Sequence, residues 1–295
     1  MSAQILDGKK LAIELKEKLK AEVEALKQEF GKGPKLVNIL IGDDDGSCAY
    51  ANSQRNTANQ VGIEYELKTL PNKTSQEEFC ALLEQLNEDS AVNGIMVHKP
   101  VPEHIDYKKA SKFISTIKDL EGINIENIGR MSLGETRILP CTPASVMEHL
   151  KSTGVELRGK EVAIVGASDI VGKPLALLLL REYATVHMCH VATSEAGKLV
   201  EHINNADIVV VAVGKAGLIK GEWIKEGAIV IDVGINRVEG KIVGDVEFET
   251  AKDRASFITP VPGGVGPVTV VMLMRNGIEA FKIQNNILEK SNSGK

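Results

Sequence analysis

The first thirty residues place apolar and polar side chains with a helical period. Apolar residues recur every three or four positions, at Leu11, Leu15, Leu19, Val23 and Leu26. This spacing gathers apolar side chains on one face of an α-helix, and Asp7 precedes the run as a residue type that caps helix starts. We therefore predict an amphipathic helix over residues 7–30, ended by Gly31, Gly33 and Pro34.

Short apolar runs then alternate with helical patterns. Strands are predicted over 36–41, 63–70 and 94–98, and helices over 47–61 and after the capping sequence Thr74-Ser75-Gln76-Glu77. Further along, Thr142 and Pro143 predict a helix start, followed by strands over 161–165, 184–189, 207–213 and 228–233 and a last helix over 268–287. The polar tail 289–295 is expected to be disordered. This alternation predicts an α/β fold with parallel sheets between helices, whose ligands bind at the carboxyl ends of the strands.

Length and charge narrow the class of protein. A chain of 295 residues suggests two domains, since a domain typically has about 150 residues. Its 35 basic and 40 acidic side chains give a net charge of −5, which argues against a nucleic-acid-binding surface. The apolar runs fall short of the ~20 residues of a membrane helix, and the N-terminus does not resemble a signal peptide. Four widely spaced cysteines favour free thiols over a disulfide framework or zinc site, so we expect a cytoplasmic protein.

Two loops are rich in glycine. Residues Gly166–Gly172 follow a strand and open a helix, the setting in which backbone N–H groups bind a pyrophosphate, although a purely structural turn explains the spacing equally well. Residues Pro260–Pro267 combine proline and glycine in a stiff segment with few side chains. Such a loop lies close to a ligand or acts as a rigid hinge.

Several longer motifs extend this pattern over nearly the whole chain. They are Lys118-Asp119 with Gly122, Asn127 with Gly129-Arg130, and the segments Pro140–Pro143, Val165–Pro174, Ile231–Gly234 and Thr259–Thr269. Together they closely resemble the methylenetetrahydrofolate dehydrogenase/methenyltetrahydrofolate cyclohydrolase (FolD) family. The resemblance implies a catalytic folate-binding domain of residues 1–140 completed by 268–295, and a Rossmann-like NAD(P)-binding domain of residues 141–267. It also implies an active-site cleft between the two domains and a homodimer.

The same resemblance assigns site residues. The implied catalytic residues are Tyr50, Gln54 and His98, and the implied substrate-binding residues are Glu121, Pro262, Gly263 and Gly264. The implied cofactor-binding residues are Gly166, Ala167, Ser168, Ile170, Val171, His190, Gly214 and Ile235. Three positions depart from the family: Gln54 stands at its lysine, His98 at its glutamine and Glu121 at its pterin-binding aspartate.

The departure at Gln54 separates the family's two reactions. Hydride transfer from methylenetetrahydrofolate chiefly requires that the donor carbon and the nicotinamide ring be aligned. Hydrolysis of the methenyl product requires a group that takes a proton from water, and an amide does not titrate. We therefore expect the dehydrogenase to survive and the cyclohydrolase to be weak or lost.

His98 leaves an alternative open. An imidazole with an ordinary pKa near ~6.5 is able to act as a substitute base, which would keep the protein bifunctional; otherwise His98 only replaces the hydrogen bonds of the family's glutamine. Arg55 is not expected to act as a base, because its guanidinium stays protonated. Glu121 keeps a carboxylate for a pterin ring but is one methylene longer.

The choice of nucleotide is weighed from the residue types near the glycine turn. Ala167 and Val191 stand where relatives often carry donors for a 2′-phosphate, and Asp169 adds negative charge. These residues favour NAD over NADP, although Lys173 is a further candidate for a phosphate contact. His187, Cys189 and His190 lack further ligands nearby, so no metal site is predicted.

The prediction is therefore an NAD(P)-dependent oxidoreductase of one-carbon metabolism that acts on a small folate substrate, without nucleic-acid or membrane partners. Two other hypotheses remain: a non-catalytic folate or nucleotide binder, and an enzyme for another pterin, a small imine or an amino acid.

Overall fold

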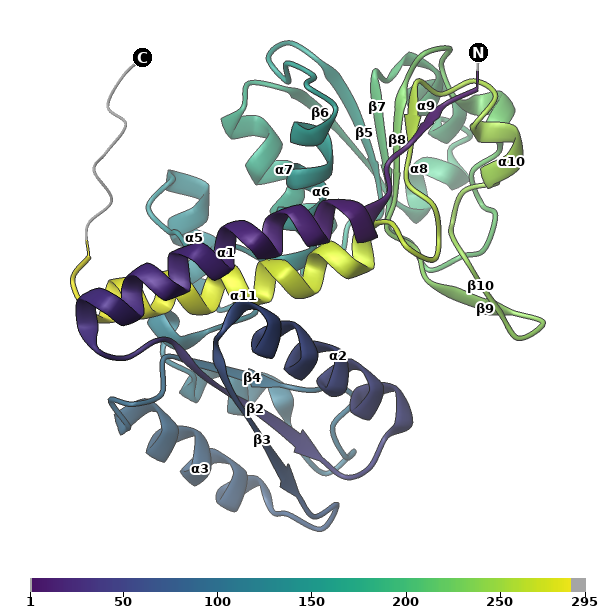
Figure 1. Ribbon diagram of the computed structural model, residues 1–295. Coiled ribbons are helices and arrows are strands. Elements are labelled where there is room, and N and C mark those ends of the chain that lie inside the picture. Colours follow the sequence, from purple (N-terminus) through teal and green to yellow (C-terminus); the bar gives the residue numbers. More distant parts are fainter. Residues whose placement is uncertain (1, 288–295) are drawn as a thin grey trace. The chain divides into compact units, whose positions relative to one another are not determined.

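The computed structural model describes residues 2–287 (Figure 1). The chain divides into two compact units. Unit 1 takes the chain up to Ile13 together with Pro140–Thr269, and unit 2 takes Glu14–Leu139 and the chain from Val270. The division falls inside two long helices, α1 (Gly8–Phe30) and α11 (Val265–Gln284). The predicted tail 289–295 lies outside the described residues.

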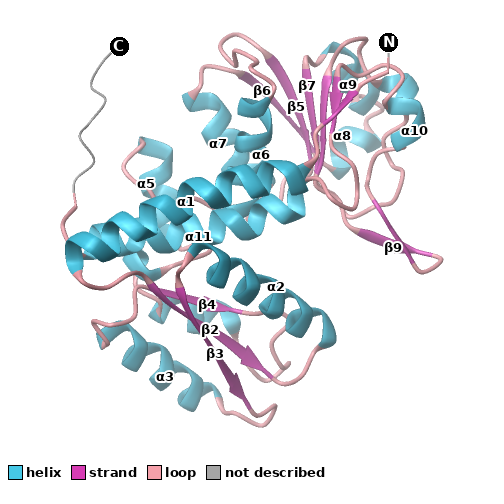
Figure 2. Cartoon of the chain, in the orientation of Figure 1, coloured by secondary structure: helices cyan, strands magenta, loops and turns pink. Residues whose placement is uncertain are grey.

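Unit 2 is built on a three-stranded parallel sheet (Figure 2). Strand β2 (Lys35–Ile41) lies between β3 (Glu64–Leu70) and β4 (Gly94–Val97). One face of β2 presents Val37, Ile39 and Ile41 to a core that includes Phe79 and Leu83 of α3 (Gln76–Glu88). Alternate residues point to opposite faces of a strand, so Asn38 faces the other side, toward α2 (Asp45–Val61). The parallel sheet predicted from the alternation of elements is confirmed.

The helix starts in unit 2 follow local capping chemistry. The Asp44 carboxylate accepts a 2.8 Å hydrogen bond from the Ser47 N–H at the start of α2, and Gly62 in a left-handed conformation ends that helix. Helix α3 starts one residue later than predicted, because Ser75 forms the capping box with Glu78, whereas the Thr74 hydroxyl donates to the Pro71 carbonyl. Shorter helices follow: α4 (Tyr107–Ala110), η1 (Ser111–Phe113), η2 (Thr116–Lys118) and α5 (Ile125–Leu133).

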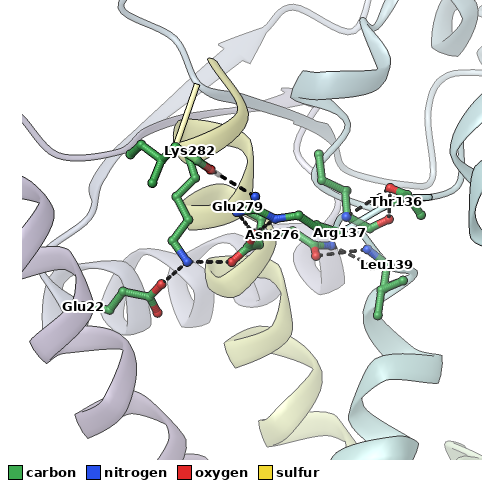
Figure 3. A network of polar contacts seen from close by, with 9 residues as sticks. Glu22, Thr136, Arg137, Leu139, Asn276, Glu279 and Lys282 are labelled. Atoms are coloured by element: carbon green, nitrogen blue, oxygen red, sulfur yellow. Dashed lines mark hydrogen bonds and ion pairs between the residues drawn. The ribbon is translucent and has the colours of Figure 1, made fainter. Parts of the chain in front are cut away.

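Helix α11 is held in unit 2 by a polar network (Figure 3) and by an aromatic contact. The Lys282 ammonium pairs with Glu279 and with Glu22 of α1, and Glu279 also pairs with Arg137. Asn276 donates hydrogen bonds of 2.8 and 2.7 Å to the carbonyls of Leu120 and Leu139. In addition, the rings of Phe30 and Phe281 meet edge to face with centroids 5.9 Å apart. These contacts make the second half of α11 part of the unit that contains β2.

Unit 1 contains a six-stranded sheet with the order β1-β11-β8-β7-β5-β6 and parallel pairing throughout. Its strands are β1 (Gln4–Ile5), β5 (Glu161–Val165), β6 (Thr185–Cys189), β7 (Ile208–Val211), β8 (Ile229–Asp232) and β11 (Phe257–Ile258). We predicted that the catalytic domain starts at residue 1, whereas the start of the chain lies in unit 1. Because β1 pairs with β11, Gln4 and Ile5 belong to the sheet of unit 1.

Helices cover both faces of this sheet (Figure 1). Helices α6 (Cys141–Ser152) and α7 (Gly172–Arg181) lie on one side, and α8 (Val191–Glu195), α9 (Leu199–Asn205) and α10 (Phe248–Ala251) lie on the other. The remaining elements are η3 (Gly221–Trp223) and an antiparallel hairpin of β9 (Asn236–Val238) and β10 (Lys241–Val243).

The predicted starts of two unit 1 helices are wrong by a few residues. Helix α6 begins at Cys141, because the Pro140 carbonyl already accepts from the Ala144 N–H at 2.9 Å, so Thr142 lies inside the first turn and does not cap it. Helix α11 begins at Val265 and not at residue 268. Pro267 is tolerated there, because the first turn of a helix has N–H groups without intrahelical partners. None of the helices in residues 2–287 is long and apolar enough to cross a membrane.

Candidate functional site

Unit 2 brings the predicted residues Tyr50, Gln54 and His98 together on one face of its sheet. Asn38 of β2 is in register with Met96 of β4, and His98 lies two residues beyond Met96 on the same face. Tyr50 and Gln54 are four residues apart on α2 and so share one face of that helix. Contacts confirm the placement: Gln54 is bonded to Asn38, and the rings of Tyr50 and His98 meet edge to face at 6.0 Å.

Gln54 is fully buried in a network of neutral side chains. Its Oε1 accepts hydrogen bonds from Asn38 Nδ2 at 2.5 Å and from the Tyr65 hydroxyl at 3.2 Å. Its Nε2 donates to the sulfur of Met96 at 3.3 Å. Burial raises the pKa of Tyr65 far above its usual value, so this hydroxyl stays protonated. The network therefore holds no group that accepts a proton at neutral pH.

Asn38 and Tyr65 were not among the predicted site residues. The available signal for Asn38 was its position as the single polar residue within the apolar run Leu36–Ile41. A fully buried amide in such a strand needs hydrogen-bonding partners. Tyr65 carries no comparable signal, because a tyrosine in a partly exposed strand is ordinary.

His98 is buried under the ring of Tyr50, with about 1% of its surface exposed. Its Nε2 meets no hydrogen-bonding partner among residues 2–287. Burial lowers the pKa of His98 to about 4, because the charged imidazolium loses its hydration. A group with this pKa is a poor proton acceptor at neutral pH, so the geometry favours His98 as a neutral hydrogen-bonding residue over a substitute base.

The Glu121 carboxylate is held by two neighbouring side chains. Tyr107 donates its hydroxyl hydrogen to Oε2 at 3.0 Å, and the Lys99 ammonium lies 3.4 Å from Oε1. That ammonium also lies 4.7 Å from the centroid of the Tyr107 ring, a cation–π contact. Burial raises the pKa of Glu121 above its ordinary value. Lys99 and Tyr107 were missed because the sequence separates them from Glu121 by 22 and 14 residues.

The motif residues around Glu121 build its turn. The Asp119 carboxylate accepts from the N–H groups of Glu121 and Asn124, at 3.2 and 2.8 Å, and from the side-chain amide of Asn127 at 3.2 Å. The buried Lys118 ammonium donates to three carbonyls at the end of α3, those of Leu86, Asn87 and Asp89. These residues position Glu121 and the adjoining helix end.

In unit 1, the glycine turn at the carboxyl end of β5 leaves no room for two Cβ atoms. A Cβ on Gly166 would lie 2.2 Å from the Ala212 carbonyl oxygen, and Gly166 has a φ of +119°. A Cβ on Gly172 would lie 1.9 Å from the Gly166 carbonyl oxygen. The Ser168 hydroxyl accepts from the Val171 N–H at 3.2 Å and closes the turn just before α7. This backbone cradle before a helix N-terminus fits a pyrophosphate.

The other predicted cofactor residues of unit 1 lie at or near this edge of the sheet. Ile170 and Ile235 are exposed, and Ala167 is partly buried. His190 caps α8, with its backbone N–H donating to the Thr193 hydroxyl at 3.2 Å, and Gly214 follows β7 with a φ of +69°. All of these residues follow the carboxyl ends of parallel strands, where ligands of such sheets bind.

Lys173, considered above for a phosphate contact, and His187, considered for a metal site, each lie against a carboxylate of this chain. Lys173 is exposed at the start of α7 and pairs at 2.6 Å with Asp169, four residues earlier in the glycine turn, as expected of a surface charge. His187 lies 2.6 Å from the Glu161 carboxylate through Nε2.

The loop Pro260–Pro267 is held firmly within unit 1. The Gly8 N–H donates to the Gly263 carbonyl at 2.9 Å, and the Ser145 hydroxyl donates to the Val265 carbonyl at 3.0 Å. A Cβ on Gly264 would lie 2.6 Å from the Pro260 carbonyl oxygen. Pro262, Gly263 and Gly264 are therefore fixed in shape at the start of α11.

A parallel sheet with helices on both faces and a glycine cradle before α7 defines unit 1 as a Rossmann-like dinucleotide-binding fold. The model for the tetrahydrofolate dehydrogenase/cyclohydrolase catalytic domain matches residues 6–121, and that for the NAD(P)-binding domain of the same family matches residues 140–285. The chain therefore belongs to the tetrahydrofolate dehydrogenase/cyclohydrolase family.

Individual relatives agree over nearly the full length. The chain is 50% identical to the bifunctional protein FolD of Bacillus pumilus over 96% of this chain and 99% of that protein. The crystal structure of a Campylobacter jejuni FolD enzyme is similar with a TM-score of 0.92 at 42% identity, covering 97% of this chain and 100% of that one. The Trypanosoma brucei FolD complexed with NADP and an inhibitor is similar with a TM-score of 0.90 at 40% identity, covering 96% and 98%.

Proposed function

We propose that this protein oxidises 5,10-methylenetetrahydrofolate to 5,10-methenyltetrahydrofolate with NAD(P), and that it hydrolyses the methenyl product slowly or not at all. Family membership and the glycine cradle of unit 1 support the first part. The observation that carries the second part is the complete burial of Gln54 among Asn38, Tyr65 and Met96, none of which takes up a proton at neutral pH.

The residues of unit 2 supply binding and alignment. Glu121, steadied by Tyr107 and Lys99, is the proposed acceptor for N–H groups of the pterin. Tyr50, about one-third exposed, is proposed to pack against the substrate above Gln54 and His98. Pro262, Gly263 and Gly264 of unit 1 are further proposed substrate-binding residues. Hydride transfer forms a cation that the two flanking nitrogens of the substrate stabilise, so this chain has no proton to move in that step.

The residues of unit 1 are proposed to hold the dinucleotide, which accepts the hydride when bound. Gly166, Ala167, Ser168, Ile170 and Val171 form the turn for its pyrophosphate, and His190, Gly214 and Ile235 are the further proposed contacts. NAD is the proposed preference over NADP. Ala167 offers no donor for a 2′-phosphate, and the ammonium of Lys173 is already paired with Asp169.

A homodimer and a cytoplasmic location complete the proposal. The four cysteines all lie within the described residues as free thiols, which suits a reducing compartment.

Two separate assays of the purified protein test both halves of the proposal. The first measures reduction of NAD or NADP with methylenetetrahydrofolate, and the second measures the decay of supplied methenyltetrahydrofolate above its spontaneous rate. We expect turnover in the first assay, with the higher kcat/KM for NAD, and no more than slight acceleration in the second.

The results discriminate between the alternatives. Rapid enzymatic hydrolysis would contradict the weak cyclohydrolase and favour a bifunctional enzyme. Folate binding by calorimetry without turnover would indicate a binding protein, and turnover only with another pterin, an imine or an amino acid would indicate a changed substrate.

A further inference from the structure

A carboxylate cluster lies at the carboxyl ends of β7 and β8 in unit 1. Asp245 is fully buried at its centre. Its Oδ2 accepts from the N–H groups of Val213 and Gly214 at 2.7 and 2.9 Å. Its Oδ1 accepts from the Lys215 N–H at 2.8 Å and from the side-chain amide of Asn236 at 2.8 Å.

This arrangement is an anion-binding turn filled by the protein's own side chain. Successive backbone N–H groups that point to one side form a concave site for negative charge. The carboxylate of Asp245 occupies the concave side of Val213–Lys215 and reaches the next segment through Asn236. Hydrogen bonds to an ionised group are stronger than neutral ones, so one side chain holds both segments.

Asp232 fixes Asp245 in turn. The buried carboxylate of Asp232, at the end of β8, accepts from the N–H groups of Gly234, Asp245 and Val246 at 2.9, 3.0 and 2.8 Å. Two glycines leave the space that the two carboxylates fill. A Cβ on Gly234 would lie 2.2 Å from Cγ of Asp245, and a Cβ on Gly244 would lie 1.9 Å from Oδ2 of Asp232. The sequence motif around Asp232 and Gly234 thus has a structural purpose.

The held segments carry two of the proposed dinucleotide contacts. Gly214 lies within the turn that Asp245 closes, and Ile235 directly precedes Asn236. Both are exposed, while the carboxylate that orders them is not. Segments at the carboxyl edge of a parallel sheet line its ligand site, and their fixed shape saves the entropy of ordering them on binding.

We infer that Asp245 is a positioning residue for dinucleotide binding, which acts by fixing Val213–Lys215 and Ile235–Asn236 and touches no ligand itself. This inference rests on the proposed dinucleotide site of unit 1. It concerns affinity for the nucleotide and not for the folate, because the partners of the carboxylate are Val213–Lys215 and Asn236, whose segments carry proposed dinucleotide contacts and no proposed folate contact.

The test compares Asp245→Asn with Asp207→Asn as a matched control. Asp207 is another carboxylate of unit 1 that accepts from a backbone N–H, that of Glu161 at 3.1 Å, and pairs with Lys225. It precedes β7, at the amino ends of the strands, away from the proposed contacts. Binding of NADH or NADPH is followed by fluorescence, folate-analogue binding by calorimetry, and stability by Tm.

We expect Asp245→Asn to weaken dinucleotide binding by about tenfold or more, the equivalent of one charge-assisted hydrogen bond. The KM for the dinucleotide should rise more than kcat falls, and folate-analogue affinity should stay as in the parent. Asp207→Asn should lower Tm without a comparable loss of dinucleotide affinity.

Dinucleotide affinity equal to that of the parent in a folded Asp245→Asn protein would overturn the inference. An equal loss of affinity for the dinucleotide and for the folate analogue would also overturn it. Should that variant not fold, Asn236→Ala removes one hydrogen bond to the same carboxylate and should raise the dinucleotide Kd alone; an unchanged Kd there also contradicts the inference. A parent protein that binds neither nucleotide would instead refute the proposed function.

Discussion

Replacing Gln54 with lysine returns a titratable group to the center of the buried network in unit 2. The Gln54 amide now accepts from Asn38 and Tyr65 and is fully buried. A lysine ammonium donates where the amide oxygen accepted, so both neighbours must change roles. They are able to do so, because Asn38 Oδ1 has no partner among the described residues and the Tyr65 hydroxyl has lone pairs to offer.

The expected gain in hydrolysis follows from the value of a positioned base. Burial lowers the pKa of a lysine from about 10.4 toward neutrality, which makes a fraction of the amine available to take a proton from water. General base catalysis contributes about 10²–10⁴-fold. We therefore expect Gln54→Lys to hydrolyse methenyltetrahydrofolate at least about a hundredfold faster than the parent. The rearranged hydrogen bonds should cost about 1–3 kcal/mol of folding free energy.

The assay measures methenyltetrahydrofolate decay and methylenetetrahydrofolate oxidation for the parent, Gln54→Lys and Gln54→Met. The methionine variant is the matched control, because it fills a similar volume and breaks the same hydrogen bonds without adding a base. Hydrolysis should rise only in the lysine variant and should increase with pH as the amine loses its proton. A folded lysine variant that still oxidises its substrate but hydrolyses no faster than the methionine variant would refute the argument that a missing base limits the reaction.

Three further predictions concern the fold. Because the pKa of His98 falls to about 4 on folding from about 6.5, its stabilising contribution is complete above pH 6.5 and is lost as the pH falls toward 4, since the unfolded chain takes up the proton first. Between pH 7 and pH 5, the free energy of unfolding measured with urea should therefore fall by about 2 kcal/mol less in His98→Gln than in the parent. Equal decreases in the two proteins would show that the ring is not held neutral by burial. Gly172→Ala would place a Cβ 1.9 Å from the Gly166 carbonyl oxygen, so it should lower the free energy of unfolding by more than about 2 kcal/mol and abolish dinucleotide binding. Gly129→Ala, whose Cβ meets no described atom within 4 Å, should do neither. Equal Tm values for the two variants would contradict the close approach at Gly172. Lys118→Met leaves the carbonyls of Leu86, Asn87 and Asp89 without their ammonium donor. The free energy of unfolding measured with urea should fall by about 2–4 kcal/mol. A decrease below about 0.5 kcal/mol would mean that water replaces the ammonium.

Local pattern was enough to predict much of the architecture. Apolar runs and helical periods depend on neighbours a few residues apart, so the parallel sheets and the long first helix followed from them. The errors are also local, as at Ser75 and Cys141, where competing hydrogen bonds decide which residue begins the helix. Gln54 at the position of the family's lysine, visible from the motifs, was the basis for predicting a weak cyclohydrolase.

Other features arise only when distant segments meet. Residues before α1 join unit 1 because β1 pairs with β11, across more than 250 residues of chain. The low pKa of His98 comes from burial under Tyr50, and the neutral state of the Gln54 network comes from Asn38 and Tyr65. The partners of Asp245 come from the loop after β7 and from the first residue of β9. The amino-acid sequence by itself determined the order of elements and the types of side chain available, whereas burial and hydrogen bonding in the tertiary structure decided their protonation and partners, because both depend on groups that are remote along the chain.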